Sequence, residues 1–564
     1  MINRLEANID EGEWVDMDGD IHDGTAGAGA LDAHSVAAAR CEEIDFMRQL
    51  GVWEAATVEE CVERTGRMPV STRWVDVDKG RDGHVEIRSR LVARDFKVRG
   101  DSREFDVFAS MPPLEAKRLL FRMAVCRGSI KGTSKKGSVK LMFLDVKKAH
   151  LNGKLRDDEY EYVELPAEAG GGVGRLRRWL YGMRPAANAW EREYATKLVE
   201  SGGFVRGKAA PTVFLNPGTG VRLVVWGDDF TFLGRDNDLR KVAEKMGEWY
   251  DVKVRGFFGP DPDDMKEIRI LNRTVRWTAD GITYEADDKH VNTIVKELGL
   301  QRDSKGSELP LPRDMDAADE DEELDGDTAR RYRRLAATVN YLALDRPDLQ
   351  YTAGVLGRTA ARPTTRSWAN LKRVGRYLIS HPVMTFAYSS CDIEAVTRVI
   401  VFTDSDWAGC RVKRRSVSGG LATLGGAVLK GWSNRQASVA LSSGEAELYA
   451  ATKGAAEGLG IQSLMTDLDW SSEVEIRTDA NAARAMASRQ GLGRTRHVEV
   501  RRLWLQEAVE QRSLRIARVS GVENPADVLT KLKNFEDMAD LLRRVAIAPR
   551  DGRGERSALE CDAV

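Results

Sequence analysis

Residues 221–234, VRLVVWGDDFTFLG, place a short polar centre between two apolar arms. Two β-rich arms around a tight Gly-Asp turn predict a β-hairpin. The turn would carry Asp228 and Asp229 at its tip, where neighbouring anions repel each other and are costly to desolvate. A cation would compensate both charges, and carboxylate oxygens are ligands that suit Mg²⁺. The tip is therefore either a metal site or an ordinary exposed turn.

A third carboxylate ends another apolar stretch. Residues 139–146, VKLMFLDV, predict a buried strand that carries Asp145 near its end. Active sites are commonly built at the carboxyl ends of buried strands. If both strands belong to one sheet, Asp145 joins Asp228 and Asp229 as a third metal ligand. Such a set suits phosphoryl transfer with two metal ions about 4 Å apart.

The composition is that of a soluble globular protein, with 42% hydrophobic and 31% charged residues and a net charge of −2. A chain of 564 residues holds roughly four domain-sized units. The six cysteines form no CxxC pair, so neither a zinc site nor a disulfide framework is indicated. No apolar run approaches about 18 residues, and the first residues lack a signal-peptide core, which predicts no membrane span and no secretion.

The charge is unevenly distributed along the chain. Residues 314–327 hold nine acids and no base, whereas residues 489–518 hold eight Arg against three Glu. A predicted hairpin over residues 72–94 is also basic and contains Arg88 and Arg90. Its positive charge indicates either a solvated face or contact with a polyanion, such as a template backbone or a triphosphate.

A second set of acids lies in the C-terminal third, where three follow or end predicted strands and one lies on a long predicted helix. The set comprises Asp404, Glu447, Asp479 and Asp527. Each acid alone is readily explained as a helix cap or a surface charge. Together they predict a second carboxylate metal site.

From about residue 46 to residue 532 the chain resembles the reverse transcriptase and ribonuclease H part of copia-type long-terminal-repeat retrotransposon polyproteins. The resemblance rests on many motifs in the family's order. They include RSRLVARDFK, LDVKKAHLNGKL, LYGMRPAANAW, WGDDF, RRLAATVNYLALDRPDLQY, TDSDWAG, VALSSGEAELYAA, TDANAA, RTRHVEVR and ENPADVLTK.

The resemblance implies an α+β multidomain fold, in which a right-hand reverse transcriptase of fingers, palm and thumb precedes a ribonuclease H-like α/β domain. With the composition, it predicts six segments along the chain. They are a disordered N-terminal segment (1–40), fingers, palm and thumb (41–300), an acidic linker (301–328), a helical connection (329–395), the ribonuclease H-like domain (396–545) and a disordered tail (546–564).

The resemblance also implies roles for particular residues. Asp145, Asp228 and Asp229 match the polymerase metal ligands, and the four C-terminal acids match those of ribonuclease H. Each site would hold two Mg²⁺ ions, with Mn²⁺ as a substitute. Arg90 matches a position suited to the nucleotide triphosphate. The basic segment would hold the backbone of a hybrid through Arg494, Arg496, His497 and Arg501.

Three positions around the predicted nucleotide site depart from the family pattern. His150 stands where the family usually has Tyr or Phe, whose ring blocks a ribose 2′-hydroxyl. Pro185 replaces a Gln near the incoming nucleotide, and Gly227 precedes the two acids where a larger residue is common. We expect weaker discrimination against ribonucleotides and a looser turn.

The leading hypothesis is an RNA-directed DNA polymerase with ribonuclease H activity. Its partners would be an RNA template, a DNA primer, an RNA–DNA hybrid and dNTPs, with a homodimer possible and no membrane. The expected location is a cytoplasmic virus-like particle, the nucleus or both. Protease and integrase motifs are missing, which suggests the C-terminal portion of a polyprotein or a truncated reading frame. The alternatives are a decayed copy that only binds nucleic acid and a structural partner in a particle.

Overall fold

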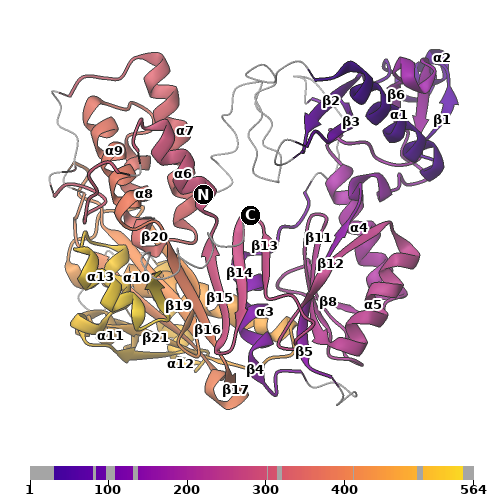
Figure 1. Cartoon of the computed structure of the whole chain (residues 1–564). Coiled ribbons are helices and arrows are strands. Elements are labelled where there is room, and N and C mark those ends of the chain that lie inside the picture. The colour runs from indigo at the N-terminus through magenta and orange to yellow at the C-terminus, as the bar shows by residue number, and fades with distance from the viewer. Residues whose placement is uncertain are drawn as a thin grey trace. The chain divides into compact units, whose positions relative to one another are not determined.

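The computed structural model describes residues 31–80, 84–96, 108–130, 137–301, 303–313, 315, 321–410, 412–491 and 500–550 (Figure 1). The chain divides into two compact units. The first contains the described residues up to 112 and those between 142 and 256, and the second contains the described parts of 113–131, 136–141 and 257–564. Among the described helices, none combines the length and the apolar character that crossing a membrane requires.

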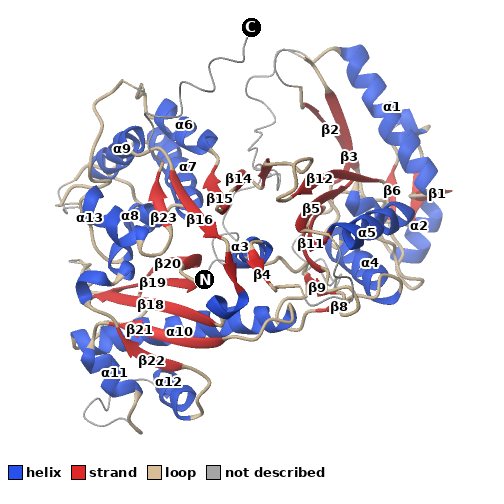
Figure 2. Cartoon of the chain, turned by 60° about the horizontal axis from the view of Figure 1, so that its bottom comes forward, coloured by secondary structure: helices blue, strands red, loops and turns tan. Residues whose placement is uncertain are grey.

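A six-stranded sheet forms the predicted palm. Its strands, in spatial order, are β12 (Val252–Phe258), β5 (Val139–Val146), β11 (Asp229–Arg235), β10 (Arg222–Trp226), β9 (Val213–Leu215) and β8 (Val205–Arg206). Helices α4 (Ala186–Glu200) and α5 (Asp236–Trp249) pack beside it (Figure 2). Because β5 and β11 are neighbours, the predicted hairpin and the predicted Asp145 strand do belong to one sheet.

The N-terminal part of this unit differs from the sequence prediction. Helices α1 (Ala33–Leu50) and α2 (Val58–Thr65) flank strand β1 (Trp53–Ala56). Helix α1 begins inside the segment expected to be disordered because Asp32 accepts a hydrogen bond from the Ser35 N–H at 2.8 Å. It ends at Gly51, whose φ of 65° stops the helix. Residues 1–30 lie outside the described residues.

Two smaller sheets complete the first unit. The predicted basic hairpin is formed by β2 (Thr72–Asp78) and β3 (Ile87–Ala93), which pair antiparallel. The other sheet has the order β1-β7-β6, with β7 (Val173–Leu176) between β1 and β6 (Tyr162–Glu164). The short 3₁₀ segment η3 (Ala149–Asn152) follows the Asp145 strand.

The second unit begins earlier than the predicted boundary at residue 300. A five-stranded sheet joins β13 (Glu267–Ile270), β14 (Arg273–Thr278), β15 (Gly281–Ala286), β16 (Met384–Ser389) and β23 (Ile547–Pro549). The predicted helical connection is thus built around strands as well, and β23 lies in the segment expected to be a disordered tail. The helices of this part of the second unit are α3 (Leu114–Ala124), α6 (Asp288–Glu297), α7 (Gly326–Ala343), α8 (Pro347–Arg358) and α9 (Thr365–Ser380). Two short strands, β4 (Cys126–Arg127) and β17 (Cys391–Asp392), pair in parallel.

Buried ion pairs hold this connection together. Asp345, which is 2% exposed, accepts hydrogen bonds from Arg118 at 2.6 Å and from Arg273 at 2.8 Å. Burial opposes ionisation of Asp345, but the two guanidinium groups hold its pKa below the ordinary range. Removing one partner from such a pair strands a buried charge at a cost of about 3–5 kcal/mol. The DRPD part of the family motif therefore has a structural role.

The ribonuclease H-like part has a mixed sheet in the order β20-β19-β18-β21-β22. Its strands are β18 (Arg398–Asp406), β19 (Val417–Leu424), β20 (Ala427–Arg435), β21 (Glu473–Thr478) and β22 (Arg515–Arg518). Strand β18 pairs antiparallel with β19 and parallel with β21, and α10 (Ser443–Asp467) packs along the sheet (Figure 2). Around it lie α11 (Asn481–Ala487), α12 (Val500–Glu510), η7 (Pro525–Leu529) and α13 (Phe535–Arg543). The predicted fold class is confirmed.

Candidate metal centres

The hairpin tip has the geometry of a two-residue turn. Trp226 pairs with Asp229, so Gly227 and Asp228 form the loop. Gly227 has a φ of 64°, which a two-residue loop with glycine at its first position requires. Its carbonyl accepts a hydrogen bond from Trp190 Nε1 of α4 at 2.9 Å. This backbone conformation favours glycine, so Gly227 suits the turn that it was expected to loosen.

Strand pairing brings Asp145 beside the tip. The N–H of Val146 donates to the Asp228 carbonyl at 3.1 Å, so the two acids lie on neighbouring backbones. Asp228 is exposed, whereas Asp145 and Asp229 are half-buried. Arg255 Nη1 lies 3.5 Å from Asp229 Oδ1. The three acidic residues thus lie at the same end of the neighbouring strands β5 and β11.

His150 and Arg90 meet at a shared aromatic ring. The His150 ring packs edge-to-face on Tyr181, with centroids 5.5 Å apart, and Arg90 lies 5.5 Å from the centroid of the same ring. Burial and the nearby Arg90 lower the pKa of His150 to about 4. His150 is therefore neutral at physiological pH. Of Arg90, His150 and Tyr181, Arg90 is thus the one that carries a positive charge on the predicted nucleotide side of the palm.

Pro185 contributes to the start of helix α4. It is buried and forms the N-cap of α4, where its carbonyl accepts from the Ala189 N–H at 2.9 Å. A proline suits a helix start because the first turn leaves its N–H groups unpaired. Pro185 thus orders the helix that carries Trp190, and it presents no side-chain hydrogen-bonding group.

The sequence did not reveal the role of Lys148, three residues beyond Asp145. Its ammonium lies 2.6 Å from Glu43 of α1 and 4.1 Å from the Phe46 ring centroid. Glu43 is 3% exposed, so this ion pair is well shielded. Helix α1 is therefore fastened to the segment that follows the Asp145 strand.

In the ribonuclease H-like part, three acids converge. Oxygen atoms of Asp404, Glu447 and Asp479 all lie within 4.8 Å of one another. Asp404 lies on β18, Glu447 on α10 and Asp479 directly after β21, so neighbouring parallel strands and the helix across them assemble the group. Among the described acids, the oxygens of Asp145, Asp228 and Asp229 do not all lie within 4.8 Å of one another.

Burial raises the pKa of two members of this trio, Asp404 and Glu447. Burial raises the pKa of Asp404 to about 6, and burial together with Asp404 raises the pKa of Glu447 to about 8. Glu447 Oε1 accepts from the Ser405 N–H at 3.0 Å and from the Ser405 hydroxyl at 2.8 Å. Among the residues that the structure describes, Glu447 Oε2 is buried without a hydrogen-bond partner. Three close oxygens with an unpaired one among them fit a divalent cation.

The fourth predicted ligand, Asp527, stands apart from this trio. Lys531 Nζ lies 2.5 Å from Asp527 Oδ1 and 3.6 Å from Asp404 Oδ2, while Lys533 Nζ lies 2.6 Å from Asp527 Oδ2. Despite burial, hydrogen bonds from both lysines hold the pKa of Asp527 below its ordinary value. The expected four-acid set is thus three assembled acids and one paired with ammonium groups. The motif ENPADVLTK includes Lys531, but its spacing assigns no role to it.

Two further acids surround the trio. Asp406 accepts a hydrogen bond from the Val417 N–H, and burial raises its pKa to about 7. Glu445 accepts from the Leu441 N–H at 2.9 Å and from the Tyr449 hydroxyl, so it orders the start of α10. Of the predicted nucleic-acid residues, Arg494, Arg496 and His497 lie outside the described residues, as does the side chain of Arg501 in α12.

Residues 57–306 match the family model described as reverse transcriptase (RNA-dependent DNA polymerase). The Pol polyprotein from transposon TNT 1-94 of Nicotiana tabacum is 24% identical over 514 residues, covering 87% of this chain and 36% of the relative. That from transposon RE2 of Arabidopsis thaliana is 27% identical over 498 residues, covering 85% of this chain and 32% of the relative.

Among solved structures, the foamy viral protease-reverse transcriptase in complex with double-stranded DNA aligns with a TM-score of 0.48 and 11% identity, over 87% of this chain and 71% of that chain. The chain spans about a third of the length of the two Pol polyproteins. Residues 57–306 thus carry a reverse transcriptase domain, and Pol polyproteins from plant copia-type transposons are similar to this chain over most of its length.

Proposed function

We propose that the chain copies RNA into DNA at Asp145, Asp228 and Asp229 and cleaves the RNA of the resulting hybrid at Asp404, Glu447 and Asp479. The observation that carries the proposal is the occurrence of two acidic centres on two separate sheets, the first inside the reverse transcriptase match. Polymerisation and RNA cleavage are both phosphoryl transfers, for which carboxylates and divalent ions are suited.

At the palm, Asp145, Asp228 and Asp229 would hold the metal ions beside the primer end and the incoming nucleotide. When bound, Mg²⁺ supplies electrostatic stabilisation as the primer 3′-hydroxyl attacks the α-phosphate and pyrophosphate leaves. Arg90 would contact the triphosphate, since a guanidinium makes bidentate phosphate contacts. The neutral His150 would face the sugar as a smaller polar group than Tyr or Phe.

At the second centre, Asp404, Glu447 and Asp479 would hold Mg²⁺, which supplies an activated water for attack on an RNA phosphate. Glu447 is anchored through Oε1 to Ser405, and this leaves Oε2 to bind the cation. Asp527 would join as the fourth acid if Lys531 and Lys533 moved away from it.

Primer extension and hybrid cleavage by matched variants test the proposal. Wild-type protein should extend a primed RNA template with dNTPs and Mg²⁺, and Asp228→Asn should remove extension while retaining cleavage of a preformed hybrid. Asp404→Asn should show the reverse pattern. Wild-type extension no better than that of Asp228→Asn would contradict the polymerase claim. Binding without either activity would instead favour a decayed copy that only holds nucleic acid.

A further inference from the structure

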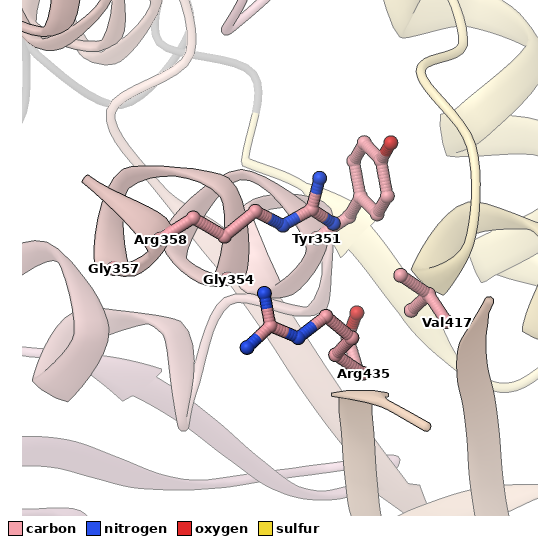
Figure 3. A pocket seen from close by; sticks show the side chains of 7 residues that line it. Tyr351, Gly354, Gly357, Arg358, Val417 and Arg435 are labelled. Carbon is pink, nitrogen blue, oxygen red and sulfur yellow. The ribbon is translucent and has the colours of Figure 1, made fainter. Parts of the chain in front are cut away.

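A small cavity lies between the connection and the ribonuclease H-like sheet, within the second unit. Helix α8 lines it with Tyr351, Gly354, Gly357 and Arg358, and the opposite wall includes Ser433 and Arg435 of β20. Its volume is about 180 Å³. Figure 3 shows the side chains of Arg358 and Arg435 entering the same space from these two elements.

The cavity is lined by two basic side chains, of which Arg358 also acts on the nearby Asp406 and lowers the pKa that burial raises. No acidic residue lines it, and within the described chain neither Arg358 nor Arg435 forms a salt bridge. Arg358 is half-buried, with its guanidinium carbon 5.9 Å from the Tyr351 ring centroid, whereas Arg435 is exposed. Two guanidinium groups facing one space repel each other, and an anion between them removes that repulsion. Their planar forks suit phosphate oxygens.

The two glycines of α8 add an independent sign of a ligand. Each glycine inside a helix costs about 1 kcal/mol relative to alanine. A Cβ atom added to Gly354 or Gly357 would meet nothing within 4 Å, and neither glycine has a positive φ. The fold itself therefore gives no reason for glycine at either position. A helix face without side chains permits close approach of another backbone.

The cavity is tied to the acidic trio through shared elements. Asp404 pairs with Gly419 in the β18–β19 register, and Val417 of the cavity wall lies two residues along β19, about 7 Å away at strand spacing. Ser433 donates to the Leu529 carbonyl at 2.6 Å, and the next residue, Thr530, donates to Asp404. A hybrid whose RNA reaches the trio also carries closely spaced phosphates along both strands.

Size separates the candidate anions. Sites for small organic ligands usually occupy roughly 300–1,000 Å³, so a cavity of about 180 Å³ is too small for a complete nucleoside triphosphate. One phosphate group with its backbone passing over the glycine face fits better. We infer that Arg358 and Arg435 hold a backbone phosphodiester of the RNA–DNA hybrid while its RNA strand lies at the acidic trio. This inference rests on the proposed ribonuclease H function and deepens it.

Binding of a labelled hybrid in EDTA tests the inference without cleavage. Arg358→Gln with Arg435→Gln should weaken binding about tenfold and reduce the dependence of affinity on salt by about one phosphate contact. Arg313→Gln, at an exposed position outside the cavity, is the matched control and should bind as wild type. Unchanged affinity and salt dependence in the double variant would overturn the inference.

Neutral phosphate replacement identifies the occupant more directly. Single methylphosphonates are placed along each strand of the hybrid and tested against wild type and the double variant. At one or two neighbouring positions the replacement should weaken wild-type binding several-fold and have no further effect on the double variant. Additive losses at every position would contradict a shared contact. If inorganic phosphate or dTTP protected the cavity as well as the hybrid does, the occupant would be a free anion. That result would also contradict the inference.

The glycines provide a second test that does not depend on charge. Gly354→Ala should raise the melting temperature of the free protein, because the added methyl group has space and favours the helix. The same variant should weaken hybrid binding. A stabilised protein with unchanged hybrid affinity would contradict close approach of the backbone. If wild-type protein cleaves no hybrid at all, the proposed function fails first, whatever these variants do.

Discussion

The two acidic centres of this protein are built in contrasting ways. At the palm, strand pairing places Asp145 beside an exposed hairpin tip, and among the described acids the oxygens of these three do not all lie within 4.8 Å of one another. In the ribonuclease H-like part, Asp404, Glu447 and Asp479 are packed within 4.8 Å. Backbone geometry alone can position solvated acids, whereas crowding buried acids creates an electrostatic cost that a cation relieves. The second centre is therefore more dependent on metal for its own stability.

The largest expected effect is that of Glu447→Gln. Hybrid cleavage should fall at least about 100-fold, because the buried oxygen that completes the trio is replaced by an uncharged amide. Primer extension should be unchanged. Single-turnover cleavage and extension assays on one preparation check this pair. Cleavage within tenfold of wild type would remove Glu447 from the centre.

The same variant should stabilise the metal-free protein at high pH. The folded-state pKa of Glu447, about 8, lies above its ordinary value of 4.5, so the folded state binds the proton more tightly. The contribution of Glu447 to the free energy of unfolding is thus largest below about pH 4.5 and decreases as the pH rises to about 8. In EDTA, Glu447→Gln should have a higher melting temperature than wild type at pH 8 and a similar one at pH 5. The contributions of the other titrating groups are common to both proteins and cancel in this comparison.

Metal binding at the trio should release protons. At pH 7 the metal-free Glu447 is mostly protonated, and a cation must displace that proton. Apparent affinity should therefore rise up to about tenfold per pH unit between pH 6 and pH 8. Titration calorimetry in two buffers with different ionisation enthalpies measures the released proton. A binding heat that is independent of buffer would contradict the burial argument.

A smaller effect is expected at the palm turn. Gly227→Ala forces a side chain into φ near 64°, which costs about 1–2 kcal/mol and should slow extension several-fold by displacing the neighbouring acids. Gly247→Ala in α5 is the control, since it lies in a helix without positive φ and should be neutral or stabilising. Thermal melting and extension rates test both variants. Equal behaviour of the two would show that the turn tolerates side chains.

The smallest expected effect concerns sugar selection. Because the pKa of His150 is about 4, the ratio of ribonucleotide to deoxynucleotide use should stay constant between pH 6 and pH 8. His150→Phe should lower that ratio by adding bulk beside Tyr181. Steady-state incorporation of matched rNTP and dNTP pairs gives the ratio. No change on substitution would exclude His150 from sugar discrimination.

Local sequence patterns predicted the elements that are stabilised by residues close together in the sequence. The hairpin at Gly227, the Asp145 strand and the strand carrying Asp404 follow from apolar runs next to turns. The connection sheet could not be predicted, because β15 pairs with β16 across about a hundred residues and β16 pairs with β23 near the C-terminus. The pairing of Asp527 with Lys531 and Lys533 depends on side-chain packing, which the motif spacing does not encode.

Metal binding without nucleic acid tests the contrast between the two centres most directly. Wild type, Asp404→Asn and Asp228→Asn are titrated with Mn²⁺ in the absence of template, primer and nucleotide, and bound ions are counted by electron paramagnetic resonance. The tightest site should be lost in Asp404→Asn and retained in Asp228→Asn, because among the described acids the trio is the group whose oxygens lie within 4.8 Å of one another. Loss of the tightest site in Asp228→Asn, with retention in Asp404→Asn, would contradict this account.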